Sequence, residues 1–194
     1  MFSRDQIYSE NGLITLNSLP TTAERVNLLM HPFPFFERLD YDFEIGMYTP
    51  MREHPSVVFV DLHSLEENPI FYDTLIKNAP PSLLAVVVTE PCRSHLLGMN
   101  YTQFGGILTR VFPAERYVMG GQEIYIQKEI SGLHGCVTGL FDLYPDLDVV
   151  LDLNLCGFPT HTEDEGNMTW SNLHEAVQED IVRRLGWREI PFIQ

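Results

Sequence analysis

Short apolar runs, each followed by a polar residue, dominate the first half of the chain. Residues 56–62 read Ser-Val-Val-Phe-Val-Asp-Leu, so a β-branched run ends at Asp61. Residues 84–89 form a second run that ends at Thr89, and residues 105–109 form a third that is followed by Arg110. Continuous apolar runs of this length are typical of strands that are buried on both faces of a parallel sheet.

Segments with helical spacing lie between and after these predicted strands. Residues 70–77 form a short amphipathic pattern, and residues 169–185 form the clearest helix, with Thr169 or Ser171 as its cap and Gly186 as its stop. Its apolar positions recur every four residues, at Leu173, Val177, Ile181 and Leu185. The alternation of strands and helices predicts an α/β fold with a parallel sheet.

The pattern changes after Pro113, which predicts more than one structural unit. We expect an N-terminal arm at residues 1–22, an α/β domain at 23–118, a linker at 119–145 and a smaller, mainly helical domain at 146–194. Residues 146–155 fit either a helix or a strand, and the pattern alone leaves both open.

The polar residues at the strand ends suggest a site. The carboxyl edge of an open parallel sheet is where ligands bind. If all three apolar runs are strands of one sheet, Asp61, Thr89 and Arg110 meet there as an acid, a hydroxyl and a cation. Such a set predicts a small pocket for a phosphoryl group or another anion, although each residue taken alone is an ordinary strand end.

Charge and composition narrow the function. The formal net charge is −15, and residues 126–194 carry four basic residues against twelve acidic ones. This balance disfavours DNA binding, because nucleic-acid affinity depends on cations that neutralise phosphates. No apolar run is long enough for a membrane helix, and three scattered cysteines favour a reducing compartment, so we expect a cytoplasmic protein that does not associate with membranes.

Other chemistry-bearing residues give weaker patterns. Cysteine and histidine lie close together at Cys92 and His95, at His134 and Cys136, and at Cys156 and His161. None supplies the four paired ligands of a structural zinc site, and the glycine pairs lack a dinucleotide fingerprint, so no metal or cofactor is expected. The aromatic cluster Phe33, Phe35 and Phe36 is expected in the core or, if exposed, at a partner-binding patch.

Several segments resemble the NarL/LuxR class of bacterial response regulators. The segments 25–39, 61–63 and 106–110 are similar to parts of that family's receiver domain, with Asp61 at the phospho-acceptor position, Thr89 at the hydroxyl position and Arg110 in place of the usual lysine. Residues 120–126 are similar to the linker that follows the receiver. Residues 153–158 and 177–186 loosely match its helix-turn-helix. The resemblance implies a receiver-like, flavodoxin-like parallel sheet followed by a degenerate helix-turn-helix.

The chain departs from this family at the positions that carry its chemistry. Leu29 and Met30 stand where an acidic pair would hold Mg²⁺, so the resemblance implies that Asp61 is not phosphorylated. The matching recognition helix carries Asn172, Glu175, Gln178 and Glu179 where basic residues are expected. Its remaining candidates for nucleic-acid contact are Arg183, Arg184 and Arg188.

The expected function is therefore a phosphorylation-independent, non-enzymatic transcription regulator that acts mainly through protein contacts, as an auxiliary or antagonist of a DNA-binding regulator. Its partner would be another regulator or a second copy of the chain, with Leu173, Val177 and Ile181 as the candidate interface if that stripe is not core. Two alternatives remain open. One is a LuxR-type regulator that binds DNA directly as a dimer, and the other is a small metal-dependent enzyme using residues 156–165.

Overall fold

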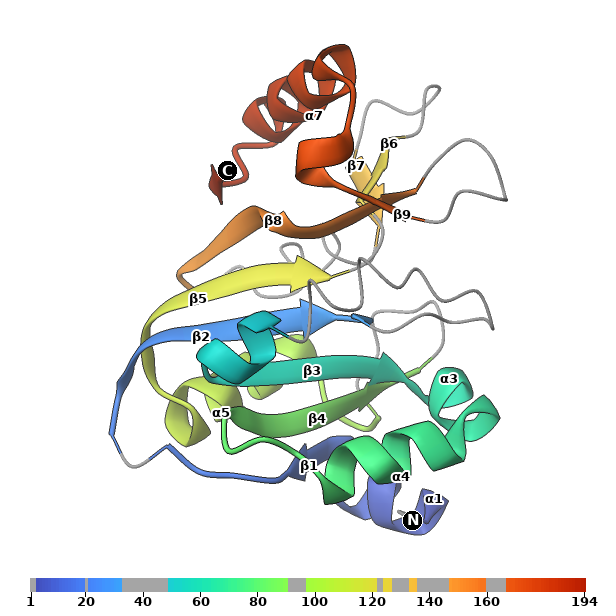
Figure 1. Cartoon of the computed structure of the whole chain (residues 1–194). Helices are drawn as coiled ribbons and strands as arrows, with labels where there is room; N and C mark the ends of the chain where they lie inside the picture. The colour runs from blue at the N-terminus through green and yellow to red at the C-terminus, as the bar shows by residue number, and fades with distance from the viewer. Residues whose placement is uncertain are drawn as a thin grey trace.

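A central, mostly parallel β-sheet organises the chain (Figure 1). The computed structural model describes residues 3–19, 21–32, 49–90, 97–121, 124–126, 133–135, 147–159 and 167–194. The sheet has eight strands, and seven of them follow the order β1-β4-β3-β2-β5-β8-β10, with β9 paired to β8. Strands β1 and β9 are antiparallel to their neighbours, and all the other pairings are parallel. The fold class predicted from the sequence, a parallel α/β sheet, is confirmed at this level.

The bounds of the strands follow the apolar runs closely in the first half of the chain. The strands of the main sheet are β1 (Leu13–Thr15), β2 (Ala23–Met30), β3 (Ser56–Asp61), β4 (Leu83–Thr89), β5 (Ala114–Gly121), β8 (Val149–Pro159), β9 (Asn167–Thr169) and β10 (Phe192–Ile193). A separate two-stranded antiparallel sheet is formed by β6 (Ile124–Ile126) and β7 (Leu133–Gly135). Every residue of β3 and β4 is buried, as their uninterrupted apolar sequences predict.

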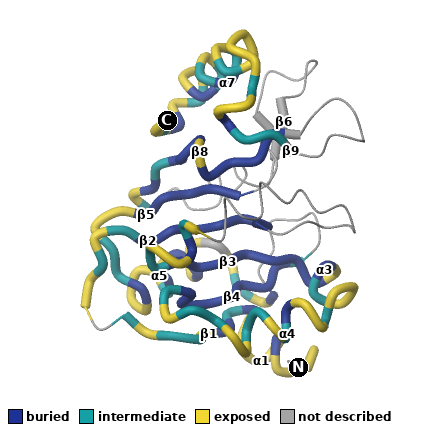
Figure 2. The backbone as a smooth tube through the Cα atoms, viewed as in Figure 1, coloured by how far each residue is buried: buried dark blue, intermediate teal, exposed yellow. Residues whose placement is uncertain are grey.

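Helices cover both faces of the sheet and leave its strands buried (Figure 2). The helical elements are α1 (Arg4–Ser9), α3 (Leu62–Glu67), α4 (Pro69–Lys77), α5 (Tyr101–Val111), the 3-10 turn η1 (Trp170–Asn172) and α7 (Glu175–Trp187). One core cluster joins the sheet to α5, η1 and α7, through residues such as Phe104, Trp170 and Ile181. The other joins it to α1, α3 and α4, through residues such as Ile7, Leu62 and Tyr72. None of the described helices is long and apolar enough to cross a membrane.

The order of the parallel strands differs from that of a flavodoxin-like receiver. Taken along the chain, the parallel strands β2, β3, β4, β5, β8 and β10 lie in the spatial order 3-2-1-4-5-6. This is the order of the classic doubly wound dinucleotide-binding fold, whereas flavodoxin-like sheets have the order 2-1-3-4-5. The order reverses between β2 and β5, so the switch point lies between their carboxyl ends.

Residues 105–109, predicted as a strand, belong to helix α5. Asn100 caps this helix, because its side chain accepts a hydrogen bond from the backbone N–H of Gln103 at 2.8 Å. Phe104 and Leu108, four residues apart, are both fully buried on the sheet. The prediction was wrong because Gly105-Gly106 followed by Ile107 and Leu108 gives a short apolar run that fits either periodicity.

The structure does not reproduce the predicted division into a receiver-like domain and a helical C-terminal domain. Strand β5 runs across the boundary expected at residue 118, and β8 and β10 complete the same sheet. Residues 153–158, which resembled a helix-turn-helix segment, lie in β8. Leu153, Cys156 and Phe158 of this segment are buried in the core cluster that also contains residues of β2 and β3.

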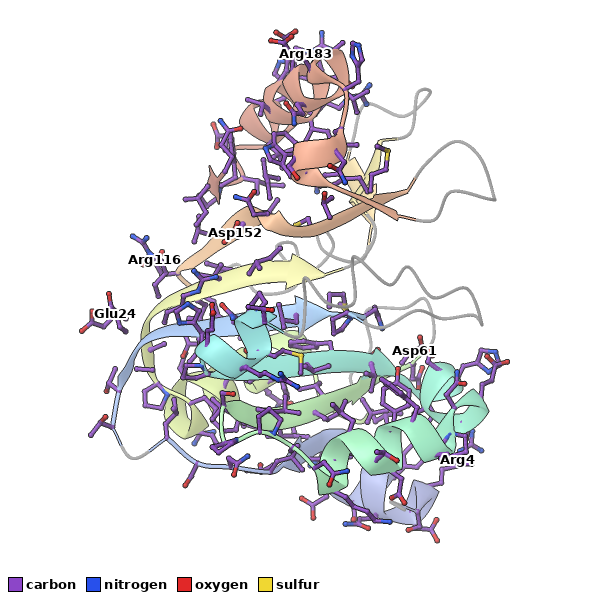
Figure 3. The ribbon with its side chains drawn as sticks, viewed as in Figure 1. Arg4, Glu24, Asp61, Arg116, Asp152 and Arg183 are labelled. Carbon is purple, nitrogen blue, oxygen red and sulfur yellow. The ribbon has the colours of Figure 1, made fainter. Side chains whose placement is uncertain are left out.

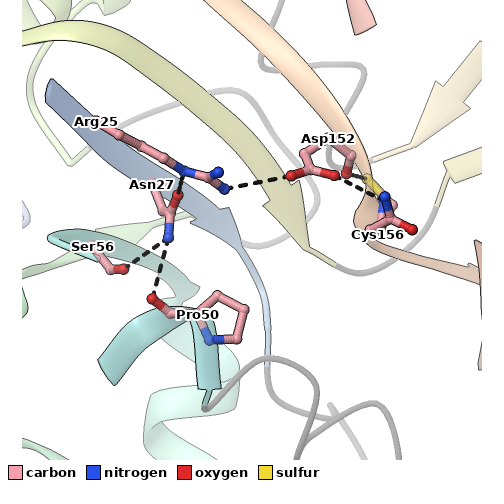
Figure 4. Close-up of polar contacts among 7 residues, drawn as sticks. Arg25, Asn27, Pro50, Ser56, Asp152 and Cys156 are labelled. Atoms are coloured by element: carbon pink, nitrogen blue, oxygen red, sulfur yellow. Dashed lines mark hydrogen bonds and ion pairs between the residues drawn. The ribbon is translucent and has the colours of Figure 1, made fainter. Parts of the chain in front are cut away.

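A polar network also joins β8 to the central strands (Figure 4). Arg25 on β2 reaches across to Asp152 on β8, with Nη2 3.4 Å from Oδ2, and its Nε donates to Asn27 Oδ1 at 2.7 Å. Asn27 Nδ2 in turn donates to Ser56 Oγ on β3 and to the carbonyl of Pro50, each at 3.4 Å. Buried polar groups are therefore satisfied by partners from three strands.

Some predictions fall on residues outside the described ranges. The aromatic cluster at residues 33–36 and the pair Cys92 and His95 lie there, as do Cys136, His161 and the other residues after position 159 of the segment 156–165.

Candidate functional site

The carboxyl edge of the sheet brings together two of the three residues of the predicted anion pocket. Asp61 ends β3 and Thr89 ends β4, and the two are register partners in the parallel ladder. Thr89 is buried, and its Oγ1 donates to the carbonyl of Val60 at 3.4 Å. This juxtaposition follows directly from two adjacent parallel strands that end at the same level.

Asp61 is a buried helix cap (Figure 3). Its exposure is 0%, and its side chain accepts two hydrogen bonds from Ser64 in the first turn of α3. The backbone N–H of Ser64 donates to Oδ1 at 2.7 Å, and the Ser64 hydroxyl donates to Oδ2 at 2.9 Å. The carboxylate therefore caps the helix that follows its own strand, and both of its oxygens are engaged within the protein.

Arg110, the third residue of the predicted pocket, lies at the opposite edge of the sheet. It is in the last turn of α5, directly before the chain enters β5 at its amino end, and its Nε donates to the carbonyl of Gly106 at 3.0 Å. The backbone bond from Ala23 to Pro113 fixes this end of α5 beside the start of β2. Because residues 105–109 are helical, they carry Arg110 away from the carboxyl edge, and the three-residue pocket does not form.

His31 is a polar residue at this edge that the sequence pattern did not reveal. It follows β2 at the switch point, is buried, and has a φ of 43°, which is unusual for a residue other than glycine and is further disfavoured before Pro32. Its Nδ1 lies 3.8 Å from Oδ2 of Asp61. Burial lowers the pKa of His31 to about 4, although the nearby Asp61 carboxylate acts to raise it. His31 is thus neutral at pH 7, and a base this weak is poorly suited to general base catalysis at that pH.

The buried histidine predicts a specific dependence of stability on pH. Because its pKa is about 4 in the folded chain and about 6.5 when unfolded, the unfolded chain binds the proton more tightly between these values. The contribution of His31 is fully present above pH 6.5 and declines as the pH falls toward 4, by up to about 3 kcal/mol. We expect His31→Asn, which tolerates a positive φ, to flatten this decline in urea unfolding measured from pH 4 to 7.5. An unchanged slope in the variant would assign the pH dependence to other groups.

The environment of Asp61 predicts that this carboxylate is not phosphorylated. A carboxylate must reach a phosphoryl donor to attack it, but Asp61 is buried and hydrogen-bonded to Ser64. Incubation with Mg²⁺ and acetyl phosphate should leave the intact mass unchanged. A stable added phosphoryl group that disappears in Asp61→Asn would contradict this expectation.

The described residues contain no cluster of three or more histidine, cysteine or acidic side chains placed to hold a metal ion. Cys156, part of the sequence pattern near residues 156–165, is buried inside β8, and its thiol donates to the carbonyl of Asp152 at 3.1 Å. Burial and the neighbouring Asp152 carboxylate raise the pKa of this thiol well above its usual range. A thiol that keeps its proton at neutral pH is a poor metal ligand.

The apolar stripe predicted on the C-terminal helix belongs mainly to the core. Helix α7 begins later than expected, with His174 rather than Thr169 or Ser171 as its cap, and it continues through Gly186 to Trp187. Ile181 and Leu185 are 1% and 0% exposed and pack on the sheet, and Leu173 packs partly against the same cluster. Ile181 is therefore a core residue and Leu173 is partly buried, whereas Val177 is 41% exposed at the flank of the helix.

The opposite side of α7, which we call the α7 outer face, carries a different set of side chains. It consists of Ala176, Glu179, Asp180, Arg183 and Trp187. Trp187 is 66% exposed, and the guanidinium of Arg183 stacks over its ring with Cζ 4.9 Å from the centroid. In Figure 3 the Arg183 side chain lies on the side of α7 away from the sheet.

The basic residues proposed for nucleic-acid contact are tied to an acid on this helix. Arg183 and Arg184 both bind the carboxylate of Asp180, the latter with Nε 2.7 Å from Oδ2. Partial burial acts to raise the pKa of Asp180, but these two hydrogen bonds lower it overall. The third candidate, Arg188, caps the carboxyl end of α7 through its backbone N–H. The three arginines thus sit on a helix packed against the sheet rather than on a helix-turn-helix.

The sequence interpretation did not identify Trp187, because it considered only the apolar stripe that contains Ile181 and Leu185. A residue two positions after Leu185 is turned by about 200° around an α-helix, so an aromatic residue there points away from the buried side. The angular position of Trp187 relative to the apolar stripe therefore predicts an exposed tryptophan.

Comparison of the chain with known protein families, with curated proteins and with solved structures found no match. The resemblance to NarL/LuxR regulators thus stays a prediction based on the quoted segments, and the strand order weighs against it.

Proposed function

We propose that this chain is a non-catalytic protein-binding module that acts through the α7 outer face. The observation that carries the proposal is the exposed Trp187 with Arg183 stacked on it. Tryptophan and arginine are the side chains that most often dominate the energetics of protein interfaces. A tryptophan that is 66% exposed leaves a large apolar area in water, and covering it with a partner is favourable.

A regulatory role through protein contacts agrees with this surface and with the acidity of the chain. A role in transcription is part of the proposal only because of the resemblance to NarL/LuxR regulators. Direct DNA binding is a weaker candidate, because Asp180 neutralises charge on Arg183 and Arg184 and the chain as a whole carries −15. Catalysis is not favoured at the carboxyl edge, where His31 is a weak base and Asp61 is engaged as a helix cap.

A comparison of tagged variants tests the proposed function. The full chain, Trp187→Ala and the control Ile70→Ala would be used to capture proteins from the native cell. Ile70 is a suitable control because it is 80% exposed on α4, which packs against the opposite face of the sheet from α7. We expect proteins captured by the wild-type chain and by Ile70→Ala to be lost with Trp187→Ala.

Circular dichroism should show all three proteins equally folded, because neither side chain belongs to the core. If the captured set, including further copies of the chain itself, is the same for all three proteins, the α7 outer face is not the binding surface and the proposed function fails.

A further inference from the structure

The charges of α7 are arranged with opposite signs about the middle of the helix. The first half carries Glu175, Glu179 and Asp180, the second half carries Arg183 and Arg184, and Arg188 follows as the C-cap. The midpoint lies between Ile181 and Val182. Each acid lies as far before this midpoint as one arginine lies after it: Glu175 corresponds to Arg188, Glu179 to Arg184 and Asp180 to Arg183.

This arrangement is complementary to itself when two such helices run in opposite directions. A two-fold axis through the midpoint sets the acidic half of one helix beside the basic half of the other, and the helix dipoles are also opposed. In a parallel pair, by contrast, like charges would lie at the same level. The charge pattern therefore favours one orientation, the antiparallel one.

The uncharged residues of the α7 outer face follow the same symmetry. Trp187 corresponds to Ala176 in the antiparallel register, so the largest exposed side chain of one copy lies at the level of a small, exposed residue of the other. Both residues are on the side of α7 that faces away from the sheet, as is Arg183, which lies at the level of the other copy's Asp180. A symmetric pair would thus contain two tryptophan contacts and two reciprocal Arg183–Asp180 contacts; the Arg184 side chain, 17% exposed, lies outside this face and adds only to the overall charge pattern of the helix.

We propose that two copies of this chain form a symmetric dimer by antiparallel pairing of α7 through the α7 outer face. The inference rests on the proposed protein-binding function and names the partner as a second copy. The two-fold axis passes between Ile181 and Val182. Trp187 of each copy packs over Ala176 of the other. Arg183 of each copy faces Asp180 of the other, so the Arg183–Asp180 ion pair within each copy becomes part of a four-residue network across the axis.

The expected affinity of the dimer follows from the small area that two α7 helices can bury. A helix of 13 residues is about 20 Å long, and pairing two of them buries less than the roughly 1,600 Å² of a standard interface. The dimer should therefore be reversible, with a dissociation constant in the micromolar range. Because charge complementarity contributes, raising the salt concentration should weaken it.

Sedimentation velocity of the full chain from about 1 to 300 μM tests the dimer. We expect a shift from monomer to dimer across this range for the wild type, and a dissociation constant raised at least about tenfold for Trp187→Ala. Ile70→Ala serves again as the matched surface control and should associate like the wild type. Circular dichroism checks that each variant is folded.

Moving the tryptophan tests the register itself. In the double variant Ala176→Trp/Trp187→Ala, each copy carries its tryptophan at position 176 and an alanine at position 187. An antiparallel dimer with this register then regains one tryptophan contact per copy, against the alanine now at position 187. We expect the dissociation constant of the dimer to return toward the wild-type value. If association instead requires a tryptophan at position 187, the double variant should associate as weakly as Trp187→Ala.

Each outcome decides between the alternatives. A wild-type chain that stays monomeric to about 300 μM overturns the dimer, as does a dimer unaffected by Trp187→Ala or a double variant that fails to recover. If the chain is monomeric but captures a different protein only when Trp187 is present, the dimer is wrong and the proposed binding function stands. If neither self-association nor capture depends on Trp187, both fail.

Discussion

Replacing Gly121 with alanine should unfold the chain or prevent it from folding. Gly121 ends β5 with a φ of 130°, and a Cβ there would lie 1.9 Å from the carbonyl oxygen of Met30 and 2.6 Å from its nitrogen. These atoms belong to the backbone of β2, so they cannot move aside without separating the two strands at the switch point. We expect a loss of more than about 4 kcal/mol of stability, a large part of the total for a domain of this size.

Gly106→Ala is the matched control for this prediction. Gly106 lies inside α5, and a Cβ there would meet nothing within 4 Å. Alanine favours the helix, so this variant should be stabilised by about 0.5–1 kcal/mol. Urea unfolding of both variants gives the comparison. A Gly121→Ala chain that unfolds at the wild-type urea concentration would show that β2 and β5 do not approach so closely.

Replacing Asp61 with alanine should cost about 2–4 kcal/mol, because it removes a helix cap and leaves a buried hydroxyl without its acceptor. The carboxylate is fully buried and accepts both the N–H and the hydroxyl of Ser64. The loss would appear as a lower urea midpoint at pH 7. It should be much larger than that of Asp73→Ala, whose carboxylate pairs with Lys77 on the surface of α4.

A double-mutant cycle separates the two parts of this effect. In a Ser64→Ala background the hydroxyl is absent, so Asp61→Ala should cost less than in the wild type by the energy of that hydrogen bond. The remaining cost reports the cap on the N–H of Ser64. Equal costs in both backgrounds would mean that the Ser64 hydroxyl does not depend on Asp61.

The local sequence predicted the elements that have a continuous apolar run or a clear helical spacing. Strands β3 and β4 and helix α4 lie where apolar runs or helical spacing placed them. Prediction failed where a short segment fitted two periods, as in residues 105–109, because two glycines followed by two apolar residues fit a helix and a strand equally well. It also failed at the start of α7, where Thr169 and Ser171 have the right chemistry for a cap but the chain turns through η1 first.

The candidate sites divide in the same way. The meeting of Asp61 with Thr89 was predictable, because two consecutive parallel strands that pair also end together. The position of Arg110 was not, because it depended on a wrong element. His31 lies near Asp61 because β2 and β3 are neighbours in the sheet and because the backbone after β2 has a positive φ. Neither feature can be predicted from the local apolar pattern.

The sequence by itself determined the parallel α/β class, the strands β3 and β4, the strong net negative charge and the opposite signs of charge along the two halves of α7. These are local or summed properties, so they can be read without knowing which segments touch. Only the tertiary structure decided the strand order, the inclusion of β8 and β10 in the sheet and the side of α7 that stays exposed. The physical reason is that strand order and helix docking depend on contacts between segments far apart in the chain, where many pairings bury similar apolar area and only the complete core selects one.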